Sequence, residues 1–180
     1  MMLKTIAKLF GAASPDEMEG LRLDVERGYW VLEGNTDLPT FLRALPTLIS
    51  RPAFLYFEGG SPDGELQDWL DRTQIDPTEQ VARGTIWPRC EVFHIPLTPS
   101  TIEELAEISE RIAYPELAIH MHVYEPGQMI LEWHDAFDNP MHINARIAEA
   151  SVADFARSIG FSVTKQPSEQ GGDGDAEEAV

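Results

Sequence analysis

The sequence predicts an α+β protein with a single mixed or antiparallel sheet and helices mainly on one face, a two-layer sandwich. Each of the clearer predicted helices carries one apolar stripe, as expected of helices that pack on a sheet from one side. The last three predicted strands, within residues 117–147, alternate apolar and polar side chains. One face of the sheet should therefore be buried, and the other should be polar and at least partly open to solvent.

Helix and strand signals alternate along the chain. Asp37 is placed to cap a helix that has Pro39 in its first turn, Ser100 begins a capping box with Glu103, and Gly160 follows the last helix at its C-terminal cap. The expected elements are a helix at 3–10, a hairpin of 21–25 and 29–32, a helix at 38–45, a strand at 54–57, a helix at 66–70, a strand at 91–97, a helix at 102–112, three strands within 117–147 and a helix at 151–159.

The chain of 180 residues is expected to form one domain over residues 1–165, followed by a disordered acidic tail over residues 166–180. The formal net charge is −18, and residues 1–165 alone carry 26 acidic against 13 basic residues. This acidity argues against nucleic acids and anionic membranes as partners, because both are bound through Lys and Arg. It favours a basic protein partner.

Location and redox state follow from two simpler features. The single Cys90 excludes an intramolecular disulfide and is expected to be a small core residue. Lys8 interrupts the apolar stretch at the N-terminus, so no secretory signal is predicted, and no apolar run reaches the roughly 20 residues that span a bilayer. The sequence therefore predicts a cytoplasmic protein, and it leaves the oligomeric state open.

The polar face of the last three strands is the candidate functional surface. Four of the five histidines lie there, at positions that alternate with the apolar residues of the predicted strands. If the three apolar sets face one core, the opposite face collects seven polar side chains. They are His120, His122, Glu132, His134, His142, Asn144 and Arg146.

Whether the first two of these strands share a face depends on the loop around residues 125–128. A three- or five-residue loop places His120 and His122 beside Glu132 and His134, whereas a two- or four-residue loop sets the first two opposite Trp133 and Leu131. Burial favours the shared face. The other register would expose Met129, Leu131 and Trp133, or would bury imidazoles that need hydrogen-bond partners.

Two functions from different classes fit this surface. The first is a non-enzymatic binding module without a cofactor, such as an inhibitor or immunity-type protein, which docks a basic partner through the seven polar residues and Trp87. The second is a zinc-dependent hydrolase that uses His120, His122, Glu132 and His134 as metal ligands. Imidazoles at alternate positions of one strand lie about 7 Å apart, and imidazole and carboxylate groups suit zinc.

Overall fold

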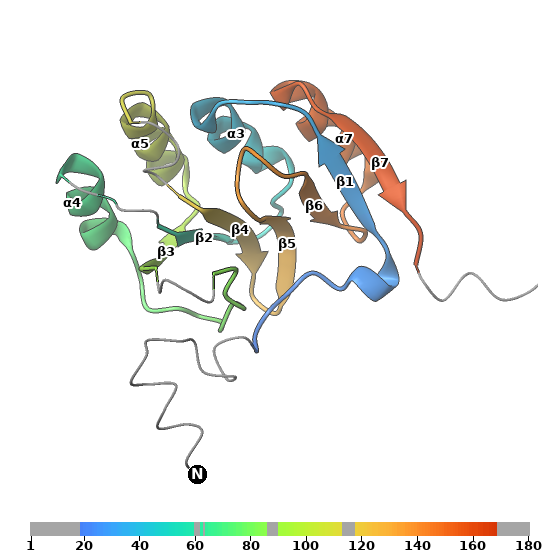
Figure 1. The fold of residues 1–180 in the computed structure, drawn as a ribbon, viewed down its shortest axis with the longest axis horizontal. Helices are drawn as coiled ribbons and strands as arrows, with labels where there is room; N and C mark the ends of the chain where they lie inside the picture. The colour runs from blue at the N-terminus through green and yellow to red at the C-terminus, as the bar shows by residue number, and fades with distance from the viewer. Residues whose placement is uncertain (1–18, 60–61, 63, 86–89, 113–117, 169–180) are drawn as a thin grey trace, which may run out of the picture.

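The computed structural model describes residues 19–59, 62, 64–85, 90–112 and 118–168. It contains a seven-stranded antiparallel sheet with the strand order β3-β2-β4-β5-β6-β1-β7 (Figure 1). The strands are β1 (Tyr29–Glu33), β2 (Phe54–Glu58), β3 (Val92–Pro96), β4 (His120–Glu125), β5 (Gln128–Trp133), β6 (Met141–Asn144) and β7 (Ser162–Gln166). The predicted single sheet of an α+β protein is confirmed.

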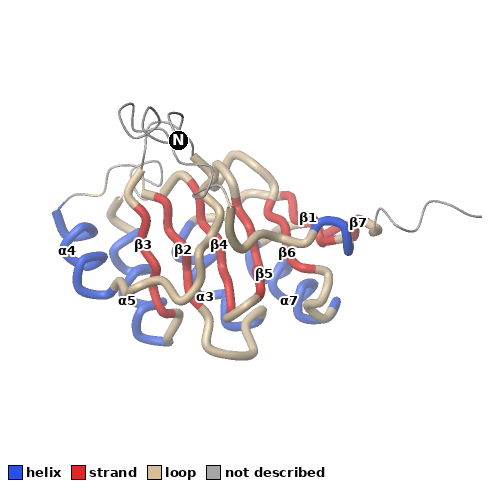
Figure 2. The backbone as a smooth tube through the Cα atoms, turned by 90° about the horizontal axis from the view of Figure 1, so that it is seen from below, coloured by secondary structure: helices blue, strands red, loops and turns tan. Residues whose placement is uncertain are grey.

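The helices gather on one side of this sheet (Figure 2), as predicted. They are α3 (Leu38–Ala44), α4 (Gly64–Thr73), α5 (Pro99–Ser109) and α7 (Glu149–Ile159), with short 3-10 turns η1 (Val25–Arg27) and η2 (Leu45–Thr47). We call the sheet face under these helices the first face and the opposite one the second face. None of the described helices is long and apolar enough to cross a membrane.

The main hydrophobic core lies between the helices and the first face. Phe41 of α3 contacts both the sheet and a neighbouring helix. Its ring centroid lies 5.0 Å from that of Trp133 in β5 and 6.1 Å from that of Phe155 in α7. All three side chains are at most 1% exposed. Trp69 of α4 is 2% exposed, and its indole N–H donates to Glu104 at the core edge. Aromatic packing therefore ties the helices to the sheet.

Helix caps agree with the sequence at two of three positions. The Asp37 side chain accepts a hydrogen bond from the Thr40 N–H, and Gly160 ends α7 with a φ of 75°. The predicted capping box at Ser100 is wrong. Helix α5 begins two residues earlier, with Thr98 as its cap and Pro99 in its first turn. Thr98 pairs reciprocally with Thr101, so the capping box satisfies N–H groups two residues earlier in the chain than predicted.

Two strand predictions are wrong. Residues 21–25 do not form a hairpin with β1, because β1 pairs with β6 on one side and β7 on the other. Strand β7 itself was missed: its side chains are mostly exposed, so it has no apolar alternation to detect. Its Lys165 covers the Trp30 ring of β1 at 4.7 Å, a cation–π contact at the sheet edge.

Three predictions concern residues outside the described part of the chain. They are the helix at residues 3–10, Trp87 as a partner-binding residue, and most of the acidic tail. At the start of that predicted tail, Gln166 belongs to β7 and pairs with Tyr29. The ordered sheet therefore extends one residue past the predicted domain boundary.

Candidate functional site

All five histidines of the chain are on or beside the second face. A row of paired residues crosses five neighbouring strands there. In strand order it runs His94, Tyr56, His122, Glu132 and His142. Three members of this row were predicted from the sequence, and two, His94 and Tyr56, were not. The alternation of His94 with buried Phe93 and Ile95 was the signal that could have found the first.

A β-bulge decides that His122 faces Glu132. The β4–β5 turn is a two-residue turn, because Glu125 pairs with Gln128, and such a turn alone would put the histidines on the wrong face. The register then shifts by one residue between Val123 and Tyr124, so that His122 pairs with Glu132. The bulge restores the shared face that burial favoured, and it turns Met129 to the second face beside Tyr124.

His120, His122 and His134 form what we call the histidine cluster. The rings of His120 and His122 are stacked with centroids 6.4 Å apart, close to the spacing expected along one strand face. The ring of His134, just after β5, makes edge-type contacts with both, with its centroid 4.6 Å from that of His122 and 5.3 Å from that of His120. On its other side, the ring of His122 stacks on Tyr56 at 5.2 Å.

The second face is covered over His120 and His122, which corrects the sequence prediction, whereas the His134 side chain is 45% exposed. His120 and His122 are only 4% and 1% exposed. Two segments, residues 19–24 and 75–85, lie across them and meet in a bridge between Leu21 and Val81. We call these two segments the cover. Leu23 and Val81 pack with Tyr56, Tyr124 and Met129 in a second, smaller apolar cluster.

Buried carboxylates hold the cover in place. Glu58, which is fully buried, accepts hydrogen bonds from the Tyr56 hydroxyl at 2.9 Å and from the N–H groups of Gly84 and Thr85 at 3.1 and 2.9 Å. Glu132 accepts from the Leu23 N–H at 2.8 Å. Each segment of the cover is therefore fastened by its backbone to a charged acceptor on the sheet, which is a strong form of hydrogen bond.

Hydrogen bonds assign the neutral tautomers of both buried histidines. His120 Nδ1 accepts from the Asp135 N–H at 2.9 Å, so its proton is on Nε2, which lies 2.9 Å from the Thr85 hydroxyl. His122 Nδ1 accepts from the Trp133 N–H at 3.3 Å. The proton on His122 Nε2 is therefore a buried donor, and it has no partner within the described residues.

The buried imidazoles of His120 and His122 are uncharged at neutral pH. Burial lowers the pKa of His122 to about 3, and the neighbouring His134 adds to that effect. Burial also lowers the pKa of His120 and of His142. Burial would raise the pKa of Glu132, but its contacts with His134 and the Leu23 N–H outweigh this and lower it overall.

The zinc hypothesis gains no support from this geometry. A zinc site needs three or more donor atoms about 2.0–2.2 Å from one point. The part of the chain that the structure describes contains no group of His, Cys, Asp or Glu placed to hold a metal ion. His120 uses both ring nitrogens in hydrogen bonds. In His122 the nitrogen without a hydrogen-bond partner among the described residues, Nε2, carries a proton and so has no lone pair for a metal.

Nucleophilic catalysis is also poorly served. Thr85, His120 and Asp135 contact one another in the order hydroxyl, imidazole, carboxylate, as in a catalytic triad. However, His120 Nε2 already carries a proton, so it cannot remove one from the Thr85 hydroxyl. Burial raises the pKa of the half-buried Cys90 thiol, and Glu58 raises it further. A protonated thiol is a weak nucleophile at neutral pH.

The remaining predicted site residues lie toward β6 and are more accessible. His142 is half-buried, with its ring 5.0 Å from that of Tyr29. The Asn144 side chain donates to the Met129 carbonyl and accepts from the Arg146 N–H, so it serves the local backbone. Arg146 is exposed. Among the seven predicted residues, the covered ones are therefore His120, His122 and Glu132, and the more accessible ones are His134, His142, Asn144 and Arg146.

No protein-family model, curated protein or solved structure matches this chain.

Proposed function

We propose that this protein is a non-enzymatic binding module that docks a basic protein, in the manner of an inhibitor or immunity-type protein. The observation that supports it best is an acidic groove of about 510 Å³ between α4 and α5, on the helical side of the molecule. Four carboxylates line it, together with two arginines and the buried Trp69. The carboxylates belong to Glu65, Asp68, Glu104 and Glu107.

Two of these four carboxylates, those of Glu65 and Glu104, already have ion-pair or hydrogen-bond partners within the protein. Arg111 pairs with Glu65 at 2.7 Å, and Glu104 accepts hydrogen bonds from Trp69 and Ser100. Asp68 and Glu107 form no ion pair with any residue that the structure describes, and Asp68 is exposed. These two carboxylates are suited to receive a lysine or arginine side chain from a partner.

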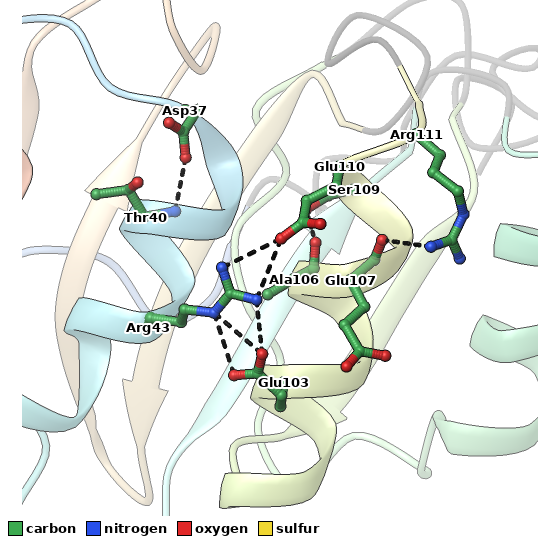
Figure 3. Close-up of polar contacts among 9 residues, drawn as sticks. All are labelled: Asp37, Thr40, Arg43, Glu103, Ala106, Glu107, Ser109, Glu110 and Arg111. Carbon is green, nitrogen blue, oxygen red and sulfur yellow. Dashed lines mark hydrogen bonds and ion pairs between the residues drawn. The ribbon is translucent and has the colours of Figure 1, made fainter.

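The far side of α5 is arranged differently. Arg43 of α3 forms ion pairs with two glutamates (Figure 3). One is Glu103 within α5, at 2.6 Å, and the other is Glu110 at the C-terminal end of α5, at 3.3 Å. In the same view Glu107 contacts Arg111 only through its backbone carbonyl, which leaves its carboxylate outside that network. Arg43 therefore partly neutralises the glutamates on the α3 side of α5. A cation from a partner gains the most electrostatic attraction in the groove on the α4 side.

The net charge of −18 adds a long-range contribution. Attraction between an acidic surface and a cationic partner raises the association rate, and added salt reduces that gain. The buried histidines contribute little to docking in this proposal, because the cover separates them from a partner. Relative to the sequence prediction, the proposed contact surface moves from the second face to the helical side.

The proposal is tested with three baits and a lysate of the native host. They are the wild-type chain, a groove variant with Asp68→Lys and Glu107→Lys, and a control with Glu26→Lys and Glu33→Lys. The control changes net charge equally at exposed positions of η1 and β1. The wild type and the control should retain the same basic protein, and the groove variant should lose it.

Association rates with that protein should then fall as salt rises from about 50 to about 500 mM, because the Debye length shortens from roughly 14 to 4 Å. If all three baits retain the same proteins equally, the groove is not the docking surface. If no bait retains any protein, the proposed function is wrong.

A further inference from the structure

A second cavity, on the opposite face of the sheet from the α4–α5 groove, lies under the cover at the β3 edge of the sheet. It has a volume of about 390 Å³ and is bounded by β2, β3 and residues 77–83. Pockets of about 300–1,000 Å³ accept small ligands. Its apolar walls include the Tyr56 ring, Val81 and Val92, and its polar groups include Glu79, Arg83 and His94.

His94 offers a hydrogen-bond donor to this cavity. His94 is 8% exposed, and its Nδ1 lies 2.8 Å from the Tyr124 hydroxyl. Burial raises the pKa of the Tyr124 hydroxyl, so this group is protonated at neutral pH and can donate to His94 Nδ1. With Tyr124 as the donor, the His94 proton is on Nε2. That Nε2 has no hydrogen bond to any described residue.

Arg83 supplies further donors and a positive charge. Its Nη1 donates to the Cys90 carbonyl at 3.0 Å, which holds the guanidinium in place at the cavity. Arginine has five N–H donors in a planar fork, so the remaining ones can bind a carboxylate. Arg83 and His94 are thus two donors in one cavity, and together they favour a ligand with an anionic acceptor group.

Glu79 limits which anions fit. One carboxylate oxygen accepts from the Gly127 N–H at 3.0 Å, and this bond fixes the side chain at the cavity wall. A simple anion would meet one fixed positive and one fixed negative charge inside a protein of net charge −18, so it would gain little. A ligand that carries both charges would satisfy both groups.

We propose that this cavity binds a small zwitterion of the α-amino acid class. The carboxylate lies against Arg83 and His94, the ammonium group lies toward Glu79, and the side chain packs on Tyr56, Val81 and Val92. This site is independent of the docking surface on α4 and α5, because the two share no residue.

The test compares three matched compounds: L-phenylalanine, 3-phenylpropionate without the ammonium group, and phenethylamine without the carboxylate. Binding to the full chain is followed by amide NMR shifts and by calorimetry at neutral pH, up to about 10 mM of each compound. Phenylalanine should saturate, with shifts at residues 78–83 and 92–94, and should bind about tenfold more tightly than either analogue.

Two variants separate the two charges. Arg83→Gln should remove the advantage of phenylalanine over phenethylamine, and Glu79→Gln should remove its advantage over 3-phenylpropionate. Glutamine at position 79 can still accept the Gly127 N–H, so the fold is retained. Arg72→Gln on α4 is the matched control and should change nothing, since Arg72 lines only the other groove.

The inference is overturned if none of the compounds saturates, or if all three bind equally well. It is also overturned if Arg83→Gln keeps its native amide spectrum and still binds phenylalanine as the wild type does. Should Arg83→Gln fail to fold, Arg83→Lys keeps the charge but loses the fork, and it should weaken phenylalanine binding while leaving phenethylamine binding unchanged.

Discussion

The two faces of the sheet are buried by different means. On the first face, helices α3, α4, α5 and α7 cover apolar side chains such as Phe57 and Trp133. On the second face, irregular segments cover His120, His122 and Glu58 and are fastened by backbone bonds to carboxylates. Apolar burial is insensitive to pH and tolerates small shifts, whereas buried polar groups depend on every partner. The first face should therefore set the stability of the fold, and the second face its response to conditions.

The largest effect should come from the first face. Phe57→Ala removes a fully buried ring of β2 and should lower the free energy of unfolding by about 3–5 kcal/mol. Urea unfolding measures this, with Val163→Ala on the exposed strand β7 as a control that changes little. A loss for Phe57→Ala as small as that of the control would contradict the division between the faces.

Acid should act mainly through the second face. The folded pKa of His122 is about 3 against 6.5 when unfolded, so between these values the unfolded chain binds a proton that the folded chain does not. Above about pH 6.5 His122 is neutral in both states, so its effect on the free energy of unfolding does not change with pH. Below that value the free energy of unfolding falls as pH drops, by up to about 1.4 kcal/mol per pH unit. Near pH 5 the loss from His122 alone is about 2 kcal/mol.

Urea unfolding at about pH 7.5 and about pH 5 measures this loss. The variant His122→Gln should show a shallower pH dependence than the wild type, because one buried titrating group is removed. Lowered pKa values of His120 and His142 add losses of the same sign. Stability that stays level or rises over this interval would show that the imidazoles are not buried as neutral groups.

A single methyl group tests how closely the cover fits. A Cβ at position 84 would lie 2.3 Å from His120 Cδ2, so Gly84→Ala must displace either the ring or the segment. The expected loss is about 1–3 kcal/mol, with faster amide exchange at Thr85 and Leu23. In the double variant with His120→Ala the added methyl should cost much less, and a double-mutant cycle measures this coupling. Additive losses would show that the two residues are not in contact.

The smallest effect should come from one fastening of the cover. Glu132→Gln keeps an oxygen that accepts the Leu23 N–H but removes the charge, so the loss should be about 1 kcal/mol or less. Amide exchange at Leu23 should accelerate while exchange at Val123, in the middle of β4, stays slow. Equal acceleration at both sites would mean that the cover and the sheet open together.

Local sequence patterns predicted most of the first face. The stripe of α3 with Phe41 and the alternation of β6 with Met141 and Ile143 are periodic signals, and burial in a single core follows directly from them. Strand β7 escaped because Lys165 and its neighbours have no apolar period. Its place depends on the free edge of β1, which is a feature of the assembled sheet.

The candidate site was only half predictable. The shared face of His120, His122 and Glu132 followed from burial, although the route was a two-residue turn corrected by a bulge. Glu58 and Tyr56 were missed because a strand buried on both faces shows no period that separates them from core residues. The predicted accessibility of His120 and His122 was wrong, because nothing local links residues 19–24 to Glu132, 109 residues from Leu23 in the chain.

The sequence by itself determined most of the helices and strands, the single sheet with helices on one side, and the grouping of histidines on one face. These properties follow from side-chain periodicity, which acts over a few residues. Only the tertiary structure decided that the second face is covered, which tautomers its imidazoles take, and that Arg83 and Glu79 share a cavity. Each of these depends on contacts between segments far apart in the chain, and the free energy of such contacts is settled only when the whole fold brings the segments together.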